Sequence, residues 1–271
     1  MKSFCYRLIS GLLFAPFLIY AILSPTSIPF LVFITAVIIL AFSEFYSLVE
    51  KRGFKAYRYL GMLLGGFVIV ISGMGFNSGL AFDGFIISLG VILYLLGRSY
   101  GKGRMAGSLA ISLAGVIYLG WTFSHLIWLR NLENGQHYLF MCFAITWGID
   151  ISAYLVGSLI GRHKLIPKIS PKKSFEGAIG GLIAAILVSI IGGSYMIPAF
   201  SPRQLLTLGL LLGVSAQLGD IVESIIKRDF GVKDSGNLIP GHGGVLDVFD
   251  GFTLSAPVMF HFIRYTLPLL K

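Results

Sequence analysis

The sequence predicts an all-α, polytopic integral membrane protein, and three observations lead to this prediction. Of the 271 residues, 56% are hydrophobic and 12% are charged, whereas soluble domains contain about 25% charged residues. Apolar stretches of about 20 residues, the length that a helix needs to cross a bilayer, recur along the chain. The polar stretches between them are too short to form a soluble domain. We therefore expect a single membrane domain over residues 1–271.

Nine apolar stretches qualify as membrane helices. Lys2 and Arg7 precede the first, and no small-residue cleavage site follows it, so we expect an uncleaved helix rather than a signal peptide. We expect the spans within 1–130 to form a scaffold or a lipid-facing part, and the spans and inner loops of 138–270 to be catalytic. The nine predicted spans are 8–23, 29–49, 59–76, 80–97, 105–129, 138–160, 175–197, 204–226 and 249–270.

The distribution of positive charge predicts the orientation of these spans. Membrane proteins concentrate Lys and Arg in their cytoplasmic loops. With nine spans and a cytoplasmic N-terminus, 17 of the 21 Lys and Arg residues fall in inside segments and four fall outside. We therefore expect a multi-pass protein of the cell (inner or plasma) membrane. Its basic loops explain the net charge of +9, so we expect no nucleic-acid partner.

Acidic residues in or beside the spans concentrate in the C-terminal half. Ionisable groups inside a membrane are costly and usually functional. Two pairs of these acids are three residues apart, so each pair shares a helix face. A satisfied ion pair is the alternative for any single acid, and we retain it for the isolated Glu44 and Asp83. The clustered acids are Asp150, Asp220, Glu223, Asp247 and Asp250.

The loop 161–174 carries five cations and two hydroxyls directly before a helix. Ser174 is a plausible N-cap, and the N-terminus of a helix attracts phosphate. A plain positive-inside loop is the alternative, and it explains the lysines. It does not explain the Ser170-Pro171 turn or the hydroxyl beside Lys173.

The loop 227–248 interleaves cations with carboxylates. Gly241, Gly243 and Gly244 allow backbone N–H groups to approach an anion closely. Carboxylates combined with cations indicate phosphates bridged by a hard metal such as Mg²⁺. His242 is open to two interpretations, a turn residue or a phosphate contact. No P-loop motif is present, so nucleotide binding of that type is not indicated.

Six short motifs follow one another between the sixth predicted span and the last. They are Trp147-x-x-Asp150-x-x-Ala153-Tyr154, Ser170-Pro171-x-Lys173-Ser174-x-Glu176-Gly177, Ser224-x-x-Lys227-Arg228, Lys233-Asp234, Pro240-x-His242-Gly243-Gly244 and Asp247-x-x-Asp250. Together they closely resemble the signature of the phosphatidate cytidylyltransferases, also called CDP-diacylglycerol synthases. The resemblance covers about 147–250, and the first 130 residues match only in being hydrophobic spans. One position departs from the family pattern, because Val248 stands where the family has Arg.

The resemblance implies a Mg²⁺-dependent transfer of CMP from CTP to phosphatidic acid, which yields CDP-diacylglycerol and pyrophosphate. The expected partners are CTP, phosphatidic acid and membrane lipids, and a homodimer is left open. The predicted metal ligands are Asp220, Asp247, Asp250 and Asp150. The predicted catalytic residues are Asp220, Asp247, Asp250, Lys173 and Arg228. The residues predicted to bind CTP or the lipid phosphate are Lys173, Ser174, Lys227, Arg228, Lys233, Asp234, His242, Gly243 and Gly244.

Three other functions compete with this interpretation. A CTP-dependent lipid kinase would also use CTP and act at a membrane, but it would transfer a phosphoryl group. A secondary transporter would use the intramembrane acids as an ion pathway, but transporters tend to have duplicated halves, whereas these acids crowd into one half. A CDP-alcohol phosphotransferase would carry an Asp-Gly-x-x-Ala-Arg motif, which is missing from this sequence.

Overall fold

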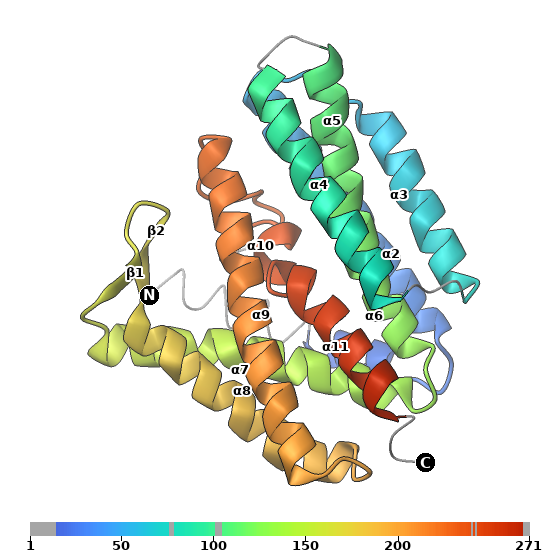
Figure 1. The fold of residues 1–271 in the computed structure, drawn as a ribbon, viewed down its shortest axis with the longest axis vertical. Helices are drawn as coiled ribbons and strands as arrows, with labels where there is room; N and C mark the ends of the chain where they lie inside the picture. The colour runs from blue at the N-terminus through green and yellow to red at the C-terminus, as the bar shows by residue number, and fades with distance from the viewer. Residues whose placement is uncertain (1–14, 76–78, 101–104, 240, 242, 268–271) are drawn as a thin grey trace. The chain divides into compact units, whose positions relative to one another are not determined.

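The protein is nearly all helical (Figure 1). The structure, a computed structural model, describes residues 15–75, 79–100, 105–239, 241 and 243–267. Seven helical stretches among these residues are long and apolar enough to cross a membrane, which confirms a polytopic membrane protein. They are Ile28–Lys51, Asp83–Tyr100, Met105–Arg130, Gly135–Ile160, Phe175–Met196, Pro202–Asp229 and Val245–Thr266.

The predicted spans from 29–49 to 204–226 each overlap described helices, but α3, with 16 residues, is shorter than the predicted span 59–76 and is not among the seven long stretches. Residues 15–23 of the first predicted span are helical, and its remainder lies outside the described residues. The helices and strands are α2 (Ile28–Lys51), α3 (Arg58–Gly73), α4 (Leu80–Tyr100), α5 (Met105–Gly115), the π-helix η1 (Val116–Trp121), α6 (Thr122–Arg130), α7 (Gly135–Ile160), β1 (Lys164–Ile166), β2 (Ser170–Ser174), α8 (Phe175–Met196), α9 (Pro202–Asp229), α10 (Val245–Phe249) and α11 (Phe252–Thr266).

Three local features differ from the prediction. The stretch 105–129 is not a uniform α-helix, because η1 separates α5 from α6. The last predicted span begins earlier than expected, in α10, and is broken at Asp250 and Gly251 before α11 begins. The loop 161–174 folds into the antiparallel hairpin β1–β2, so the all-α prediction was wrong for this loop and right for the apolar spans.

The chain forms two compact units, and the first comprises Met1–Asn131 and Lys227–Phe249. Within it, α4 and α5 lie side by side (Figure 1). Helix α2 buries a row of aromatic side chains. The Tyr46 hydroxyl donates a hydrogen bond to the carbonyl oxygen of Ser112, 3.0 Å away. The Phe45 ring packs edge-on against Phe230, with 6.3 Å between ring centroids. Helix α2 therefore holds both its neighbouring spans and the returning segment 227–249.

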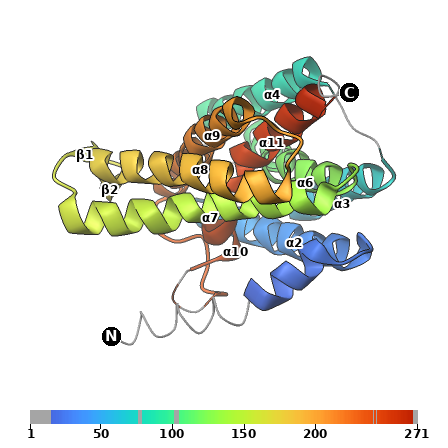
Figure 2. The same ribbon diagram turned by 90° about the horizontal axis from the view of Figure 1, so that it is seen from below.

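The second unit comprises Leu132–Ile226 and Asp250–Lys271, and its packing depends on residue size. Helices α7 and α8 run side by side in both ribbon views (Figures 1 and 2). One face of α8 carries small residues at four-residue spacing, which lets neighbouring helices approach closely. The opposite face carries large exposed residues at the same spacing. The small buried residues are Gly177, Gly181, Ala185, Ser189 and Gly193. The large exposed residues are Phe175, Ile179, Ile183, Leu187, Ile191 and Tyr195.

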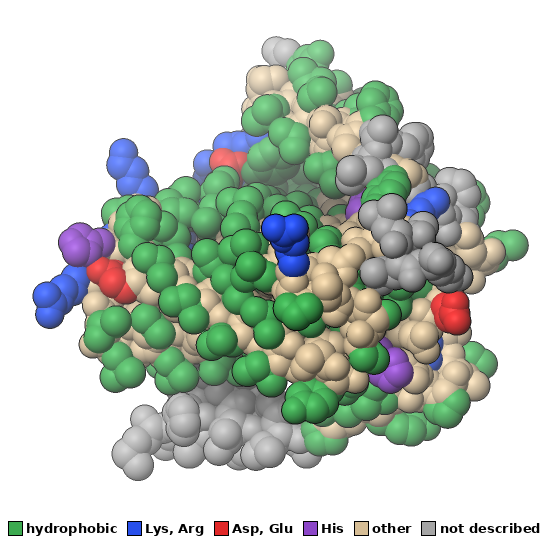
Figure 3. Space-filling model, turned by 60° about the horizontal axis from the view of Figure 1, so that its bottom comes forward, with side chains coloured by type: hydrophobic (Ala, Val, Ile, Leu, Met, Phe, Trp, Pro, Cys, Tyr) green, Lys and Arg blue, Asp and Glu red, His purple; other side chains and the backbone are tan. Residues whose placement is uncertain are grey.

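Hydrophobic side chains also cover much of the surface seen in Figure 3, and charged side chains are sparse on this face. Soluble proteins rarely expose contiguous apolar areas of this kind, whereas lipid tails solvate them without penalty. The exposed face of α8 is therefore suited to contact lipid.

Substitution Gly209→Ala in α9 should destabilise the second unit. A Cβ atom at this position would lie 2.7 Å from the Cα of Ile186 and 3.0 Å from the carbonyl oxygen of Ala185, so the backbone would have to move. We expect a loss of about 1–3 kcal/mol in the free energy of unfolding. Gly66→Ala in α3 is the matched control, because a Cβ there meets nothing within 4 Å, and it should be neutral or slightly stabilising. Equal unfolding temperatures of the two variants in one detergent would contradict this packing.

Candidate active site

The loop between α7 and α8 is an antiparallel hairpin that ends in the N-cap of α8. Strands β1 and β2 pair with Lys164 opposite Ser174. The Ser174 hydroxyl oxygen accepts a hydrogen bond from the Gly177 N–H at 3.1 Å, which confirms the predicted N-cap. Glu176, in the first turn of α8, approaches the His163 ring, with 2.6 Å between Oε1 and Nδ1. These contacts fix the end of the loop from which Lys173 extends.

Lys173 and Asp220, both predicted site residues, lie together. The Lys173 Nζ atom is 2.7 Å from Asp220 Oδ1, and both side chains are about a quarter exposed. Asp150, on α7, interacts electrostatically with both of them. The hairpin, α7 and α9 thus bring two acids and one cation to the same place. If Lys173 exchanges the Asp220 carboxylate for a phosphate oxygen, this arrangement can bind an anionic substrate.

Asp220 also belongs to a cluster of three carboxylates in the second unit. Asp220, Glu223 and Asp250 each offer one oxygen, and the three oxygens lie within 4.8 Å of one another. Glu223 and Asp250 are buried. Gly219 allows the approach, because a Cβ there would lie 2.7 Å from the carbonyl oxygen of Asp250. Oxygen ligands of this kind are those that Mg²⁺ and Ca²⁺ prefer, so the cluster is a candidate site for a hard divalent cation.

Glu223 was not among the predicted metal ligands, although the sequence contained the signal. It lies three residues after Asp220 on α9, and side chains three apart share a helix face. The prediction instead included Asp247, which the structure places in the first unit.

Asp247 accepts hydrogen bonds from several donors of the first unit. Its Oδ1 lies 2.6 Å from Lys227 Nζ. Its Oδ2 accepts from the backbone N–H of Ser235 at 2.8 Å, from the Ser235 hydroxyl at 2.9 Å and from the Gly244 N–H at 2.7 Å. In this structure, then, the Asp247 carboxylate organises the loop between α9 and α10.

Backbone hydrogen bonds close the glycine-rich turn between Ile239 and Gly244. Ile239 and Gly243 exchange N–H···O bonds of 2.8 and 3.1 Å. Gly243 has a φ of +107°, a backbone conformation that favours glycine. The next three N–H groups donate to carboxylates of the chain itself, and the first of them, that of Gly244, is one that the sequence suggested for an anion. Gly244 donates to Asp247, and the following two residues donate to Glu44.

Glu44 and Asp83, the two isolated acids, have different environments. Asp83 is buried, with Oδ2 3.0 Å from His125 Nε2 and Oδ1 accepting from Trp121 Nε1 at 3.1 Å. This agrees with the interpretation of Asp83 as a satisfied intramembrane pair. Glu44 instead accepts hydrogen bonds from Ser235, Val245 and Leu246, and the sequence interpretation missed this role.

The other predicted site residues that the structure describes belong to the part of the first unit that follows Lys227. Arg228 donates from Nη1 to the Val232 carbonyl oxygen at 3.0 Å. Lys233 and Asp234 are exposed, whereas Val248, at the position where the resembled family has Arg, is half-buried in α10. His242 lies outside the described residues.

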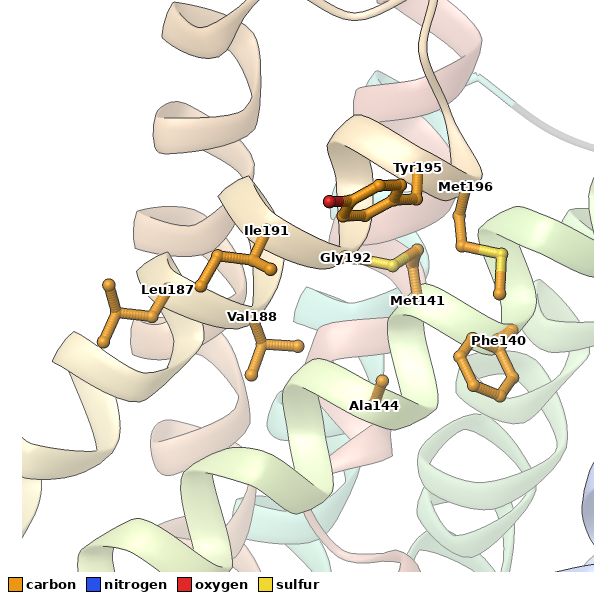
Figure 4. A pocket seen from close by; sticks show the side chains of 9 residues that line it. All are labelled: Phe140, Met141, Ala144, Leu187, Val188, Ile191, Gly192, Tyr195 and Met196. Atoms are coloured by element: carbon orange, nitrogen blue, oxygen red, sulfur yellow. The ribbon is translucent and has the colours of Figure 1, made fainter.

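An apolar groove lies between α7 and α8 within the second unit. Its volume is about 470 Å³, and α7 lines it with Phe140, Met141 and Ala144. Figure 4 shows these side chains facing those of α8, including Leu187 and Tyr195. The groove belongs to the Gly135 end of α7 and the Met196 end of α8, opposite to the end that carries Ser174. Its lining is suited to an acyl chain and offers little for phosphate chemistry.

Comparison with known proteins identifies the family. The family model described as "Cytidylyltransferase family" matches residues 5–266. The protein "Uncharacterized protein YnbB" of Escherichia coli K12 is 38% identical over 245 residues, which are 87% of this chain and 79% of that protein.

Two enzymes named phosphatidate cytidylyltransferase are also similar. The Bacillus subtilis enzyme is 44% identical over 154 residues, which are 55% of this chain and 56% of that enzyme. The Staphylococcus haemolyticus enzyme is 43% identical over 150 residues, which are 55% of this chain and 57% of that enzyme. These two alignments span little more than half of each enzyme. The family model, in contrast, covers nearly the whole chain, and the chain therefore belongs to the cytidylyltransferase family.

Proposed function

We propose that this protein is a phosphatidate cytidylyltransferase, which transfers CMP from CTP to phosphatidic acid in phospholipid biosynthesis. Membership of the cytidylyltransferase family supports the use of CTP. The observation that carries the proposal is the convergence of Asp220, Glu223 and Asp250 next to Lys173. Carboxylates and a cation together match the needs of a polyphosphate with a divalent ion.

The proposed reaction needs no nucleophile from the protein. A phosphate oxygen of phosphatidic acid forms a bond to the α-phosphorus of CTP, and the bond from that phosphorus to the bridging oxygen of the β-phosphate breaks. Pyrophosphate leaves with the electron pair, and CDP-diacylglycerol remains. Such transfers depend on positioning and on neutralising negative charge.

The proposed cofactor is Mg²⁺, held by Asp220, Glu223 and Asp250, with Asp150 nearby. When bound, a divalent ion neutralises charge on the triphosphate. Three acids at one place also repel one another unless a cation is present, because like charges at short range are costly. The three carboxylate oxygens of the second unit therefore fit a hard cation as ligands.

The cations of the site are proposed to bind phosphate. Lys173 would exchange its partner Asp220 for a phosphate oxygen once a metal engages that carboxylate. Ser174 places the N-terminus of α8 at the same end, where anions are favoured. The other proposed contacts to CTP or the lipid phosphate are Lys227, Arg228, Lys233, Asp234, His242, Gly243 and Gly244, and Asp247 is proposed to orient Lys227.

The proposed setting is a cell membrane with the site facing the cytoplasm. The asymmetry of 17 inside to four outside Lys and Arg residues supports nine spans with the N-terminus inside. Lys173 and Ser174 then lie at the cytoplasmic end of α8, where CTP is available. The spans within 1–130 are proposed as the scaffold and 138–270 as the catalytic part, in one membrane domain, and a homodimer remains open.

The position of a radioactive label in CTP tests this function directly. With the purified protein, phosphatidic acid and Mg²⁺, label on the α-phosphorus should enter the lipid, and label on the γ-phosphorus should appear in pyrophosphate. Asp220→Asn should lower the rate at least 100-fold, about 2.7 kcal/mol, because an amide cannot replace the charged ligand. Label from the γ-phosphorus in the lipid would instead identify a lipid kinase.

Direct metal binding tests the carboxylate cluster independently of turnover. Mn²⁺, used as a paramagnetic substitute for Mg²⁺, should bind the detergent-solubilised protein at least about tenfold more weakly in Glu223→Gln, a difference of about 1.4 kcal/mol. Glu133→Gln is the matched control, because Glu133 is exposed in the loop before α7. Equal Mn²⁺ affinity in the two variants would remove Glu223 from the site.

A further inference from the structure

Glu44 is an acid within the apolar part of a candidate membrane helix, and its hydrogen-bond partners lie far away in the sequence. It belongs to α2, whose residues Ile28–Lys51 have a mean hydropathy of 2.3 in their most apolar window. Its partners are 191 to 202 residues further along, in the loop before α10 and at the start of α10. Ionisable residues within membrane spans are functional candidates by default. All these residues belong to the first unit.

We propose that Glu44 is a positioning residue for nucleotidyl transfer, which shapes the glycine-rich turn and so holds Asp247 against Lys227. This inference rests on the proposed function, because it concerns Lys227 and Gly244, which that function proposes as contacts to CTP or the lipid phosphate. Glu44 acts through the loop 235–246 and not by touching the reacting atoms.

The Glu44 carboxylate first fixes the start of α10. Its Oε1 accepts from the Val245 N–H at 2.8 Å, and its Oε2 accepts from the Leu246 N–H at 2.9 Å. The first N–H groups of a helix lack partners within the helix, and a negative charge is favourable at that end. Because α10 has only five residues, these two bonds determine the direction in which it starts.

Ser235 then connects Glu44 to Asp247. The Ser235 hydroxyl lies 2.9 Å from Glu44 Oε2 and 2.9 Å from Asp247 Oδ2. A hydroxyl has one hydrogen to donate, so the two carboxylates share this donor. The Ser235 N–H also donates to Asp247 at 2.8 Å. A displaced Glu44 would therefore change the hydrogen bonding of the carboxylate that pairs with Lys227.

Two glycines of the loop make room for the Glu44 carboxylate. A Cβ at Gly236 would lie 2.7 Å from Glu44 Oε1. A Cβ at Gly244 would lie 2.3 Å from Glu44 Oε2 and 2.2 Å from the Ser235 hydroxyl oxygen. The turn thus fits closely around this side chain.

A purely structural role for Glu44 makes a different prediction. Its hydrogen-bond donors Ser235, Val245 and Leu246 are neutral groups, so what Glu44 stabilises is one conformation of the loop. If the role of Glu44 were purely structural, its substitution would lower the free energy of unfolding of the protein. A positioning residue would lower kcat while the binding of the lipid substrate stays nearly unchanged, because a small displacement in a site can cost about 100-fold in rate.

The test compares Glu44→Gln with Glu50→Gln, the same substitution on the exposed end of the same helix. Glutamine keeps the shape but presents one acceptor oxygen and an NH₂ group, so it cannot accept from all three donors. For Glu44→Gln we expect kcat for CDP-diacylglycerol formation to fall at least about tenfold, with KM for phosphatidic acid within about twofold. Amide hydrogen exchange of 235–248 should accelerate at least about tenfold, while α7 and α8 stay protected. Glu50→Gln should change neither quantity.

The outcomes separate this inference from the proposed function. Faster exchange in 235–248 with unchanged kcat would overturn the positioning role, and so would Glu44→Gln behaving like Glu50→Gln. A wild-type protein that forms no CDP-diacylglycerol would refute the proposed function and, with it, this role, whereas the exchange data would still show whether Glu44 orders the loop. If Glu44→Gln does not fold, Ser235→Ala removes only the bridging hydroxyl and should produce the same split between kcat and KM.

Discussion

The ion pair between Lys227 and Asp247 is the interaction on which the conformation of the loop between α9 and α10 depends. The two residues are 20 positions apart, and their charged atoms are 2.6 Å apart. Their side chains are only 11% and 7% exposed, so either charge would be costly without the other. The same carboxylate accepts hydrogen bonds from the N–H groups of Ser235 and Gly244, and Asp247 therefore joins the end of α9 to both sides of the loop.

The N-terminal spans do more than fill the membrane, because they hold this segment at several points. Glu44 of α2 binds the start of α10. On α4, the Tyr94 hydroxyl donates to Asp229 Oδ2 at 2.7 Å, and Arg98 forms an ion pair with the same carboxylate. Phe45 packs on Phe230. Helices α2 and α4, which lie in the part of the chain that we expected to be a scaffold, thus make specific polar contacts with the segment 227–249.

The helical spans were predictable because bilayer thickness imposes a length that composition reveals. Features that depend on residues close in the sequence, such as the Ser174 cap and the shared helix face of Asp220 and Glu223, were also predictable. The role of Glu44 was not, because its partners are about 200 residues away and no local pattern indicates them. The hairpin β1–β2 was missed because its sequence has the composition of a basic loop. The π-helix η1 was missed because its sequence is apolar like the α-helices on either side of it.

The glycine-rich turn shows why residue types alone are insufficient. The glycines suggested that backbone N–H groups could bind a phosphate, yet in the structure the Gly243 N–H donates to the Ile239 carbonyl oxygen and the Gly244 N–H donates to Asp247. Carboxylates and phosphates compete for the same donors, because both are anions that accept hydrogen bonds. Only the three-dimensional arrangement tells which anion the chain itself supplies.

A double-mutant cycle on Lys227→Met and Asp247→Asn measures the central interaction most directly. The free energy of unfolding would be determined for the wild type, both single variants and the double variant in the same detergent. If the pair organises the loop, the two substitutions should be coupled by at least about 1 kcal/mol, with the double variant less destabilised than the sum of the single ones. Additivity within about 0.5 kcal/mol would contradict the account, because independent sites add in this way.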